Sequence, residues 1–225
     1  MSYNTLVGGF AHCPAPRVSP PLQREQARML VNATLALILL AVLFPLMIIV
    51  CLAVLSDGGG PVLFGHRRIG YGGRSFVCLK FRTMTKDAEA RLAALLATDL
   101  AAREEWSRDQ KLRNDPRITR LGALLRRSSL DELPQLINVI RGEMSLVGPR
   151  PIVEAEAHHY GHRICHYNAV KPGITGLWQV SGRNDVSYRR RVALDCLYAR
   201  KRGFGLDCWI LIRTIPAVLI RRGCY

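Results

Sequence analysis

The chain has 225 residues, of which 49% are apolar, enough for one domain with a hydrophobic core and a short appendage. Its 32 basic and 17 acidic residues give a net charge of +15, which favours an anionic partner: nucleic acid, an anionic membrane face or a phosphorylated substrate. The seven cysteines contain no C-x-x-C pair, which argues against a structural zinc site.

The N-terminal segment, residues 1–23, contains Gly8-Gly9 and four prolines and has no helical periodicity. This composition predicts a disordered N-terminus. No apolar core lies near its start, so we do not interpret it as a signal peptide. We expect the first ordered element to begin near Arg24.

A hydrophobic segment follows, and residues 24–56 are predicted to enter the membrane. From Leu35 to Leu55 there is no charged residue, and a run of about 20 apolar residues is the length that a helix needs to cross a bilayer. The simplest interpretation is one spanning helix. Pro45 lies in the middle of the run, where proline removes a backbone hydrogen bond and kinks a helix.

The charges that flank this segment suggest another arrangement. Basic residues lie on both sides, Arg24 and Arg28 before it and Arg67 and Arg68 after it, and such residues prefer the cytoplasmic face. If both ends are cytoplasmic, the helix dips into the membrane and returns at Pro45, with each half reaching about 15 Å. The backbone groups freed at that bend would need partners in lipid. The residues alone leave the re-entrant and spanning helices open.

Residues 57–225 are predicted to form a cytosolic α+β domain with a short β-hairpin and several helices. The sequences PVLFGHRRIG and RSFVCLKFRTM indicate two strands joined around Tyr71-Gly72-Gly73. No helix follows these glycines, so a dinucleotide-binding loop is not supported. Lys86 to Gln110 is rich in helix-forming residues, and Leu206 to Ile220 reads as a core helix or an amphipathic helix on the membrane surface.

The densest group of reactive side chains lies between Asp115 and Pro151. Ser129 and Glu132 have the spacing of a helix capping box, and Pro134 suits a first helical turn. On that interpretation Asp131 and Glu132 only complement the helix dipole. The functional alternative is that Asp131, held ionised there beside two arginines, attacks a phosphorus atom to form an acyl phosphate. Its neighbour would hold a divalent cation, and the local pattern leaves both alternatives open.

Several basic residues are candidates for phosphate binding. Arg150 lies between two prolines that restrict its backbone, and a stiffly held arginine suits bidentate contact with phosphate. Lys80 and Arg82 share one face of a predicted strand, which is either a solvated face or an anion-binding wall. In a later turn-rich loop, Trp178 and Arg183 suit stacking on a nucleobase, with a core position for Trp178 as the alternative.

Three blocks of the sequence resemble the bacterial sugar transferases, the monotopic phosphoglycosyl transferases. They are GHRRIGYGGRSFVCLKFRTM, DPRITRLGALLRRSSLDELPQLINVIRGEMSLVGPRP and KPGITGLWQVSGRNDVSYRRRVALD. The resemblance runs from about Arg24 to Tyr225, and LDELPQ together with VGPRP is highly specific. The length is similar to that of the small exopolysaccharide-initiating undecaprenyl-phosphate galactose phosphotransferases of rhizobial type, which lack an extra N-terminal transmembrane domain.

The resemblance implies an activity: transfer of a hexose-1-phosphate from a UDP-hexose to undecaprenyl phosphate with release of UMP. Galactose-1-phosphate is the hexose-1-phosphate that the resemblance favours. The resemblance makes Asp131 the nucleophile and Glu132 its partner, with both engaging Mg²⁺, and it favours a re-entrant helix bent at Pro45. The matching basic positions near the diphosphate are Lys80, Arg126, Arg127 and Arg150, to which the strand pattern adds Arg82; Arg183 matches a position near the nucleotide.

The same resemblance implies the first membrane step of exopolysaccharide repeat-unit synthesis, at the cytoplasmic face of the bacterial inner membrane. It leaves the choice of sugar and a homo-oligomer open. Relatives usually carry Tyr-Val-x-x-Trp-Ser where this chain has Tyr198-Ala-Arg-Lys-Arg-Gly203, a departure that puts local packing or membrane contact in question. The alternative is a membrane-anchored, non-catalytic scaffold of a polysaccharide assembly complex. Nucleic acid is not an expected partner, because no reading module is present.

Overall fold

The structure is a computed structural model, and it describes residues 22–58, 60–109, 112, 114–182 and 186–219. The predicted disordered segment up to residue 21 and the predicted nucleotide-binding Arg183 lie outside the described residues. The domain is α+β, as predicted: helices surround a two-stranded antiparallel sheet and a short two-stranded parallel sheet.

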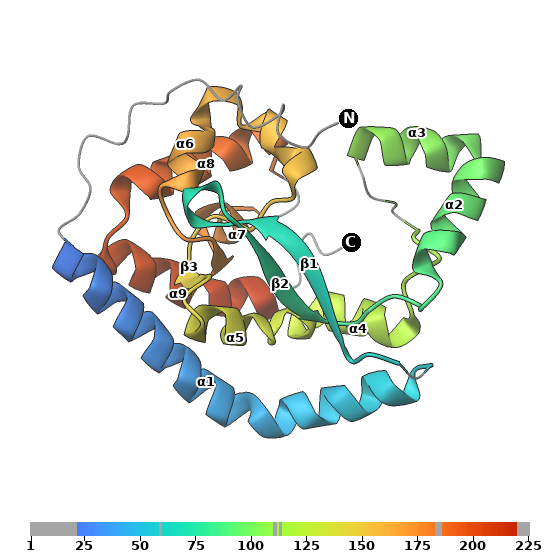
Figure 1. Ribbon diagram of the computed structural model, residues 1–225, viewed down its shortest axis with the longest axis horizontal. Coiled ribbons are helices and arrows are strands. Elements are labelled where there is room, and N and C mark those ends of the chain that lie inside the picture. The colour runs from blue at the N-terminus through green and yellow to red at the C-terminus, as the bar shows by residue number, and fades with distance from the viewer. Residues whose placement is uncertain (1–21, 59, 110–111, 113, 183–185, 220–225) are drawn as a thin grey trace.

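Helix α1 extends from Leu22 to Ser56 and contains the whole predicted hydrophobic segment. The chain stays helical through Pro45, and Figure 1 shows that the helix changes direction along its length as it passes beneath the domain. Of the described helices, α1 alone is long and apolar enough to cross a membrane, and 17% of its most apolar stretch is buried. Its outer face therefore exposes large apolar side chains, among them Leu37, Val42 and Ile49.

The predicted hairpin is confirmed. Strand β1, Leu63–Ile69, pairs antiparallel with β2, Ser75–Phe81, and the connection is a single turn of 3-10 helix, η3, at Tyr71–Gly73. Gly72 and Gly73 have φ values of 67° and 75°, a left-handed conformation that glycine adopts without steric cost. The glycines thus serve the turn and not a phosphate loop.

The predicted helix between Lys86 and Gln110 is two helices, α2 at Ala88–Thr98 and α3 at Leu100–Asp109. Asp99 between them is extended, with φ −114° and ψ 109°, and its carboxylate accepts a hydrogen bond from the N–H of Ala102 at 3.0 Å. This aspartate ends one helix and caps the next, a use of Asp that competes with helix continuation. Figure 1 shows both helices projecting from the rest of the domain.

The remaining elements build the body of the domain. They are α4 (Arg120–Ser128), η4 (Leu130–Glu132), α5 (Gln135–Ile140), β3 (Ser145–Val147), η5 (Glu154–His159), η6 (Gly161–Arg163), α6 (Ile164–Asn168), β4 (Gly173–Thr175), α7 (Leu177–Val180), α8 (Tyr188–Lys201) and α9 (Phe204–Leu219). Strands β3 and β4 pair in parallel.

Helix α1 packs on the domain through two hydrophobic clusters. The larger joins Ala36 of α1 to Val139 of α5 and Ile210 of α9. The other joins the C-terminal half of α1 to β2 and α4 through Val54 and Phe81. Both halves of the helix are therefore held against the same domain, which fixes the ends of β2 and α4 relative to α1.

Helix α9 contains the described part of the predicted helix at 206–220. Ile210 is fully buried in the core, whereas Phe204, Ile212 and Ile215 are more than 60% exposed. The helix thus contributes one side to the core, as one of the two alternatives predicted, and leaves further apolar side chains exposed. A position on the membrane surface stays a prediction.

Candidate active site

The backbone around Asp131 is set by the end of α4. Ser129 has φ 58°, the left-handed conformation, and its N–H bonds to the carbonyls of Arg126 and Leu125. The predicted capping box is therefore wrong: an N-cap residue needs extended backbone, and the Ser129 side chain makes no cap bond. Ser129 instead ends α4 and turns the chain into η4, whose first turn contains Asp131 and Glu132.

Lys80 of β2 lies between the two carboxylates. Its Nζ is 2.7 Å from Glu132 Oε1 and 3.7 Å from Asp131 Oδ2. Arg150 contributes a second cation, with Nη1 at 3.7 Å from Glu132 Oε1. The fold thus brings together four of the predicted site residues from three separate parts of the chain.

The two carboxyl groups have opposite pKa shifts. Burial alone would raise the pKa of Glu132, but the charges of Lys80 and Arg150 and the hydrogen bond from Lys80 outweigh it and lower the pKa to about 2. Burial raises the pKa of Asp131, and the neighbouring Glu132 charge adds to this although Lys80 opposes it. Asp131 therefore takes up a proton more readily than Glu132 does. Pairs of acids driven apart in this way are typical of catalytic sites.

The other predicted phosphate ligands take different positions. Arg126 donates through Nε to the hydroxyl of Thr83 at 2.9 Å, and its charge acts on Asp131. Arg127 is exposed on α4. Arg82 donates through Nη2 to the Val54 carbonyl at the end of α1, at 3.0 Å. Phosphate binding by these arginines stays a prediction, and Arg82 has a role in holding α1.

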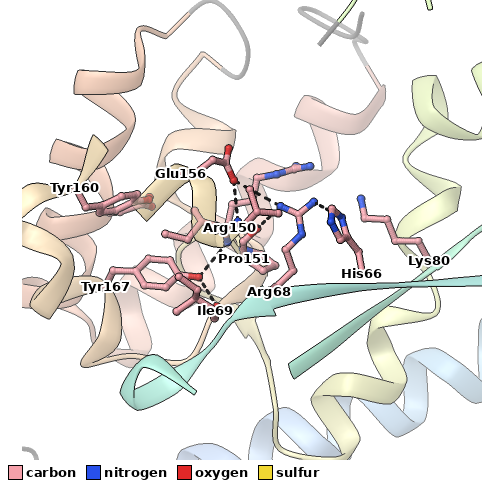
Figure 2. Close-up of polar contacts among 12 residues, drawn as sticks. His66, Arg68, Ile69, Lys80, Arg150, Pro151, Glu156, Tyr160 and Tyr167 are labelled. Carbon is pink, nitrogen blue, oxygen red and sulfur yellow. Dashed lines mark hydrogen bonds and ion pairs between the residues drawn. The ribbon is translucent and has the colours of Figure 1, made fainter. Parts of the chain in front are cut away.

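Arg68 of β1 is a site residue that the sequence reasoning missed. Figure 2 shows its guanidinium between His66 and Glu156, on the same side of the hairpin as Lys80 and Arg150. It donates through Nη1 to the Pro151 carbonyl at 3.2 Å and lies 3.6 Å from Glu156 Oε2. A small cavity is lined by Arg68 together with Lys80, Glu132 and Arg150.

The position of Arg68 follows from the hairpin register. The sequence pattern suggested only that it belonged to the basic flank of the membrane segment. His66 and Arg68 alternate on one face of β1 opposite Cys78 and Phe76 of β2, and strand alternation places such residues on one side. The same strand alternation that placed Lys80 and Arg82 on one face of a predicted strand places His66 and Arg68 on one face of β1. This pattern is the signal in the sequence that could have identified Arg68.

Trp178 belongs to the core, the alternative that the sequence left open. Its side chain is 5% exposed, and the Arg191 guanidinium lies 4.6 Å from its ring centroid, a cation–π arrangement. A nucleobase cannot stack on the ring face that Arg191 covers.

The unusual segment 198–203 includes the end of α8 and contacts the N-terminal end of α1. Arg202 lies 3.0 Å from Glu25 of α1. The Tyr198 hydroxyl donates to the Val147 carbonyl and to Asp207, which also pairs with Arg28. The ion pair of Arg202 with Glu25 thus ties this segment to the N-terminal end of α1.

The chemistry of the site suits a bound phosphate and a divalent cation. Among the described residues there is no group of three or more His, Cys, Asp or Glu side chains placed to hold a metal ion. The acidic oxygen donors at this site are the adjacent carboxylates of Asp131 and Glu132. Mg²⁺ commonly binds through one or two carboxylates and completes its shell with phosphates and water. The donor set therefore fits Mg²⁺ carried by a diphosphate substrate.

Comparison with known proteins gives the family. The family model for bacterial sugar transferases matches residues 23–221. The chain is 52% identical over 193 residues to the exopolysaccharide production protein ExoY of Rhizobium meliloti (strain 1021), covering 86% of this chain and 84% of that protein. It is 50% identical over 212 residues to the UDP-galactose-lipid carrier transferase of Erwinia amylovora, covering 93% of this chain.

A third relative is the undecaprenyl-phosphate galactose phosphotransferase of Salmonella typhimurium, 46% identical over 212 residues and 93% of this chain. The chain spans 44% of the length of the Erwinia and of the Salmonella protein. The matches cover every element that builds the site, from α1 to α9. The chain therefore belongs to the bacterial sugar transferase family and is a transferase enzyme.

Proposed function

We propose that this protein transfers a hexose-1-phosphate from a UDP-hexose to undecaprenyl phosphate and releases UMP, with galactose as the proposed hexose. The names of the Erwinia and Salmonella relatives support galactose and a lipid carrier, and that of the Rhizobium relative supports exopolysaccharide production. The observation that carries the proposal is the buried Asp131 beside Glu132, with Lys80 within 3.7 Å of both. This step would be the first membrane reaction in building a repeat unit.

The reaction proceeds in two displacements. A carboxylate oxygen of Asp131 attacks the sugar-linked phosphorus of the UDP-hexose, and the bond from that phosphorus to the bridging oxygen breaks, so UMP leaves with the electron pair. An oxygen of undecaprenyl phosphate then attacks the same phosphorus and the bond to Asp131 breaks, which gives a lipid diphosphate sugar and restores the carboxylate. A covalent intermediate divides one difficult transfer into two easier ones.

The basic residues stabilise the charge that develops during both steps. Lys80 and Arg150 already face the carboxylate pair and would hold the diphosphate oxygens, as fixed cations do in phosphoryl transfer. Mg²⁺, when bound by Glu132 and Asp131, would neutralise the diphosphate charge. Glu132, whose pKa is lowered to about 2, stays ionised at any physiological pH and so keeps its metal-binding form.

We propose further that α1 is a re-entrant membrane helix at the cytoplasmic face of the bacterial inner membrane. Its two ends both bind the domain: Arg28 pairs with Asp207 of α9, and the Val54 carbonyl accepts from Arg82. A straight spanning helix would carry its ends to opposite faces, so contacts from both ends to one domain favour entry and return. The bend in α1 (Figure 1) and its exposed apolar face support this.

The proposal is tested by UMP release from the full chain in detergent, with undecaprenyl phosphate and a panel of UDP-sugars. UDP-galactose should be the best donor, and Asp131→Asn should abolish release. If the protein were instead a non-catalytic scaffold, no UDP-sugar would yield UMP and Asp131→Asn would leave polymer output unchanged. The absence of a capping bond from Ser129 already weakens the purely structural interpretation of this turn.

A further inference from the structure

A second cavity lies away from the carboxylate pair. It has a volume of about 340 Å³, lies between the first turns of α1 and the body of the domain, and is open on one side. None of its lining residues also lines the small cavity beside Glu132. Its size is at the lower end of the range for small-molecule sites, about 300–1,000 Å³.

The walls of this cavity are largely apolar. They come from α1, from the end of α5 and from the loop before β4, and they include Met29, Leu30, Ala33, Ile140 and Val170. Leu30 is 70% exposed, so the apolar surface continues from the cavity onto the outside of α1. A surface of this kind suits an aliphatic chain, because removing methylene groups from water is favourable.

The charged residues at the rim are mostly neutralised within the protein. Arg202 pairs with Glu25, and Arg28 pairs with Asp207. Lys171 is different: it is partly buried beside Gly142 and Met29, and no described residue forms a hydrogen bond or ion pair with its ammonium group. The charge of Glu25 acts on Lys171, but that carboxylate already bonds to Arg202.

We propose that this cavity binds a membrane phospholipid, with the headgroup phosphate on Lys171 and part of an acyl chain along Met29, Leu30 and Ile140. A lysine without a direct hydrogen-bond or ion-pair partner among the described residues, beside an apolar wall, matches an amphiphile with a single anionic headgroup. The inference rests on the proposed function only in placing α1 in the membrane. A nucleotide fits less well, because the one aromatic ring of the lining, Tyr198, is buried and bonded through its hydroxyl.

The test measures retention of phosphatidylglycerol by the detergent-purified full chain, by native mass spectrometry and by titration with short-chain phosphatidylglycerol. Lys171→Met should raise the apparent Kd about tenfold, the effect of losing one charge-assisted contact, and Lys171→Arg should restore binding. Lys201→Met is the matched control, because this substitution removes the same charge and Lys201 is exposed on α8 outside the cavity. Ala33→Phe places a larger side chain in the apolar wall and narrows the cavity, so it should also weaken phosphatidylglycerol binding.

Equal phosphatidylglycerol binding by wild type, Lys171→Met and Lys201→Met would overturn the proposal, as would no binding by any of them. Lys171-dependent binding of polyprenyl phosphate without binding of phosphatidylglycerol would also overturn it and would assign the cavity to the carrier lipid. The measurement needs no turnover. A protein that fails to release UMP but binds phosphatidylglycerol through Lys171 leaves this inference standing while the proposed function fails.

Discussion

The ammonium group of Lys80 is 2.7 Å from Glu132 Oε1 and a full ångström farther, 3.7 Å, from Asp131 Oδ2. The lysine therefore compensates Glu132 more strongly than Asp131. Burial raises the pKa of Asp131 by more than its weaker contact with Lys80 lowers it, whereas for Glu132 the charges of Lys80 and Arg150 outweigh burial. Two adjacent acids thereby acquire different properties, one permanently charged and one sensitive to its surroundings.

Replacing Lys80 should remove this organisation. We expect Lys80→Met to lower kcat for UMP release by about 100-fold, a typical cost of removing one preorganised electrostatic contact to a transition state. Steady-state kinetics with UDP-galactose would measure it, and Lys86→Met, which removes an exposed lysine, should leave kcat within about twofold. A similar loss of kcat in both variants would contradict a specific role of Lys80 in the active site.

The rate of UMP release should depend on the ionisation of Asp131. Because its pKa is raised by burial and by Glu132, the acid limb of the kcat/KM profile should lie above the ordinary range of an aspartate, and activity should fall as the pH drops through it. Lys80 and Arg150 oppose this shift, so Arg150→Met should move the limb to higher pH. A limb that is unchanged in Arg150→Met would contradict this assignment.

Arg68 should act by positioning Arg150. Its hydrogen bond to the Pro151 carbonyl and its ion pair with Glu156 fix the loop that carries Arg150. Arg68→Met should raise KM for the UDP-sugar about tenfold, the cost of losing a charged hydrogen bond, and Arg68→Lys should recover part of it. The control is Arg67→Met, since Arg67 is the exposed neighbour; a merely unstable protein would show fewer active sites at an unchanged KM.

Asp195 should make stability depend on pH. It is 1% exposed and accepts a hydrogen bond from the Tyr160 hydroxyl at 2.7 Å, and burial raises its pKa to about 7 against the opposing effects of Tyr160 and Arg191. The folded state therefore holds a proton that the unfolded chain releases near pH 4. The contribution of Asp195 to the free energy of unfolding is complete below that pH. It is lost as the pH rises towards 7, a decrease of at most about 4 kcal/mol.

Asp195→Asn keeps an acceptor for Tyr160 and removes the titration. Denaturant unfolding of the detergent-solubilised protein between pH 4 and pH 7 should show a falling midpoint for the wild type and a flatter profile for Asp195→Asn. Parallel profiles for the two proteins would show that Asp195 titrates alike in the folded and unfolded states.

The sequence by itself determined the elements whose cause is local. The length of the uncharged run from Leu35 to Leu55 set the hydrophobic part of α1, because helix formation and apolar transfer depend on neighbouring residues. The glycines at 72 and 73 determined the hairpin turn through their backbone freedom. The pairing of Asp131 with Glu132, and the family blocks around it, could be read directly from adjacent residues.

Only the tertiary structure decided which distant groups meet. Lys80 and Glu132 are 52 positions apart, and Arg202 and Glu25 are 177 apart, distances at which no periodicity predicts contact. Ser129 matched a capping box locally, yet in the structure it has a left-handed backbone that ends α4, which packs against β2 and α1. Burial likewise set the charge balance of Asp131, because desolvation depends on everything packed around a group and not on its sequence neighbours.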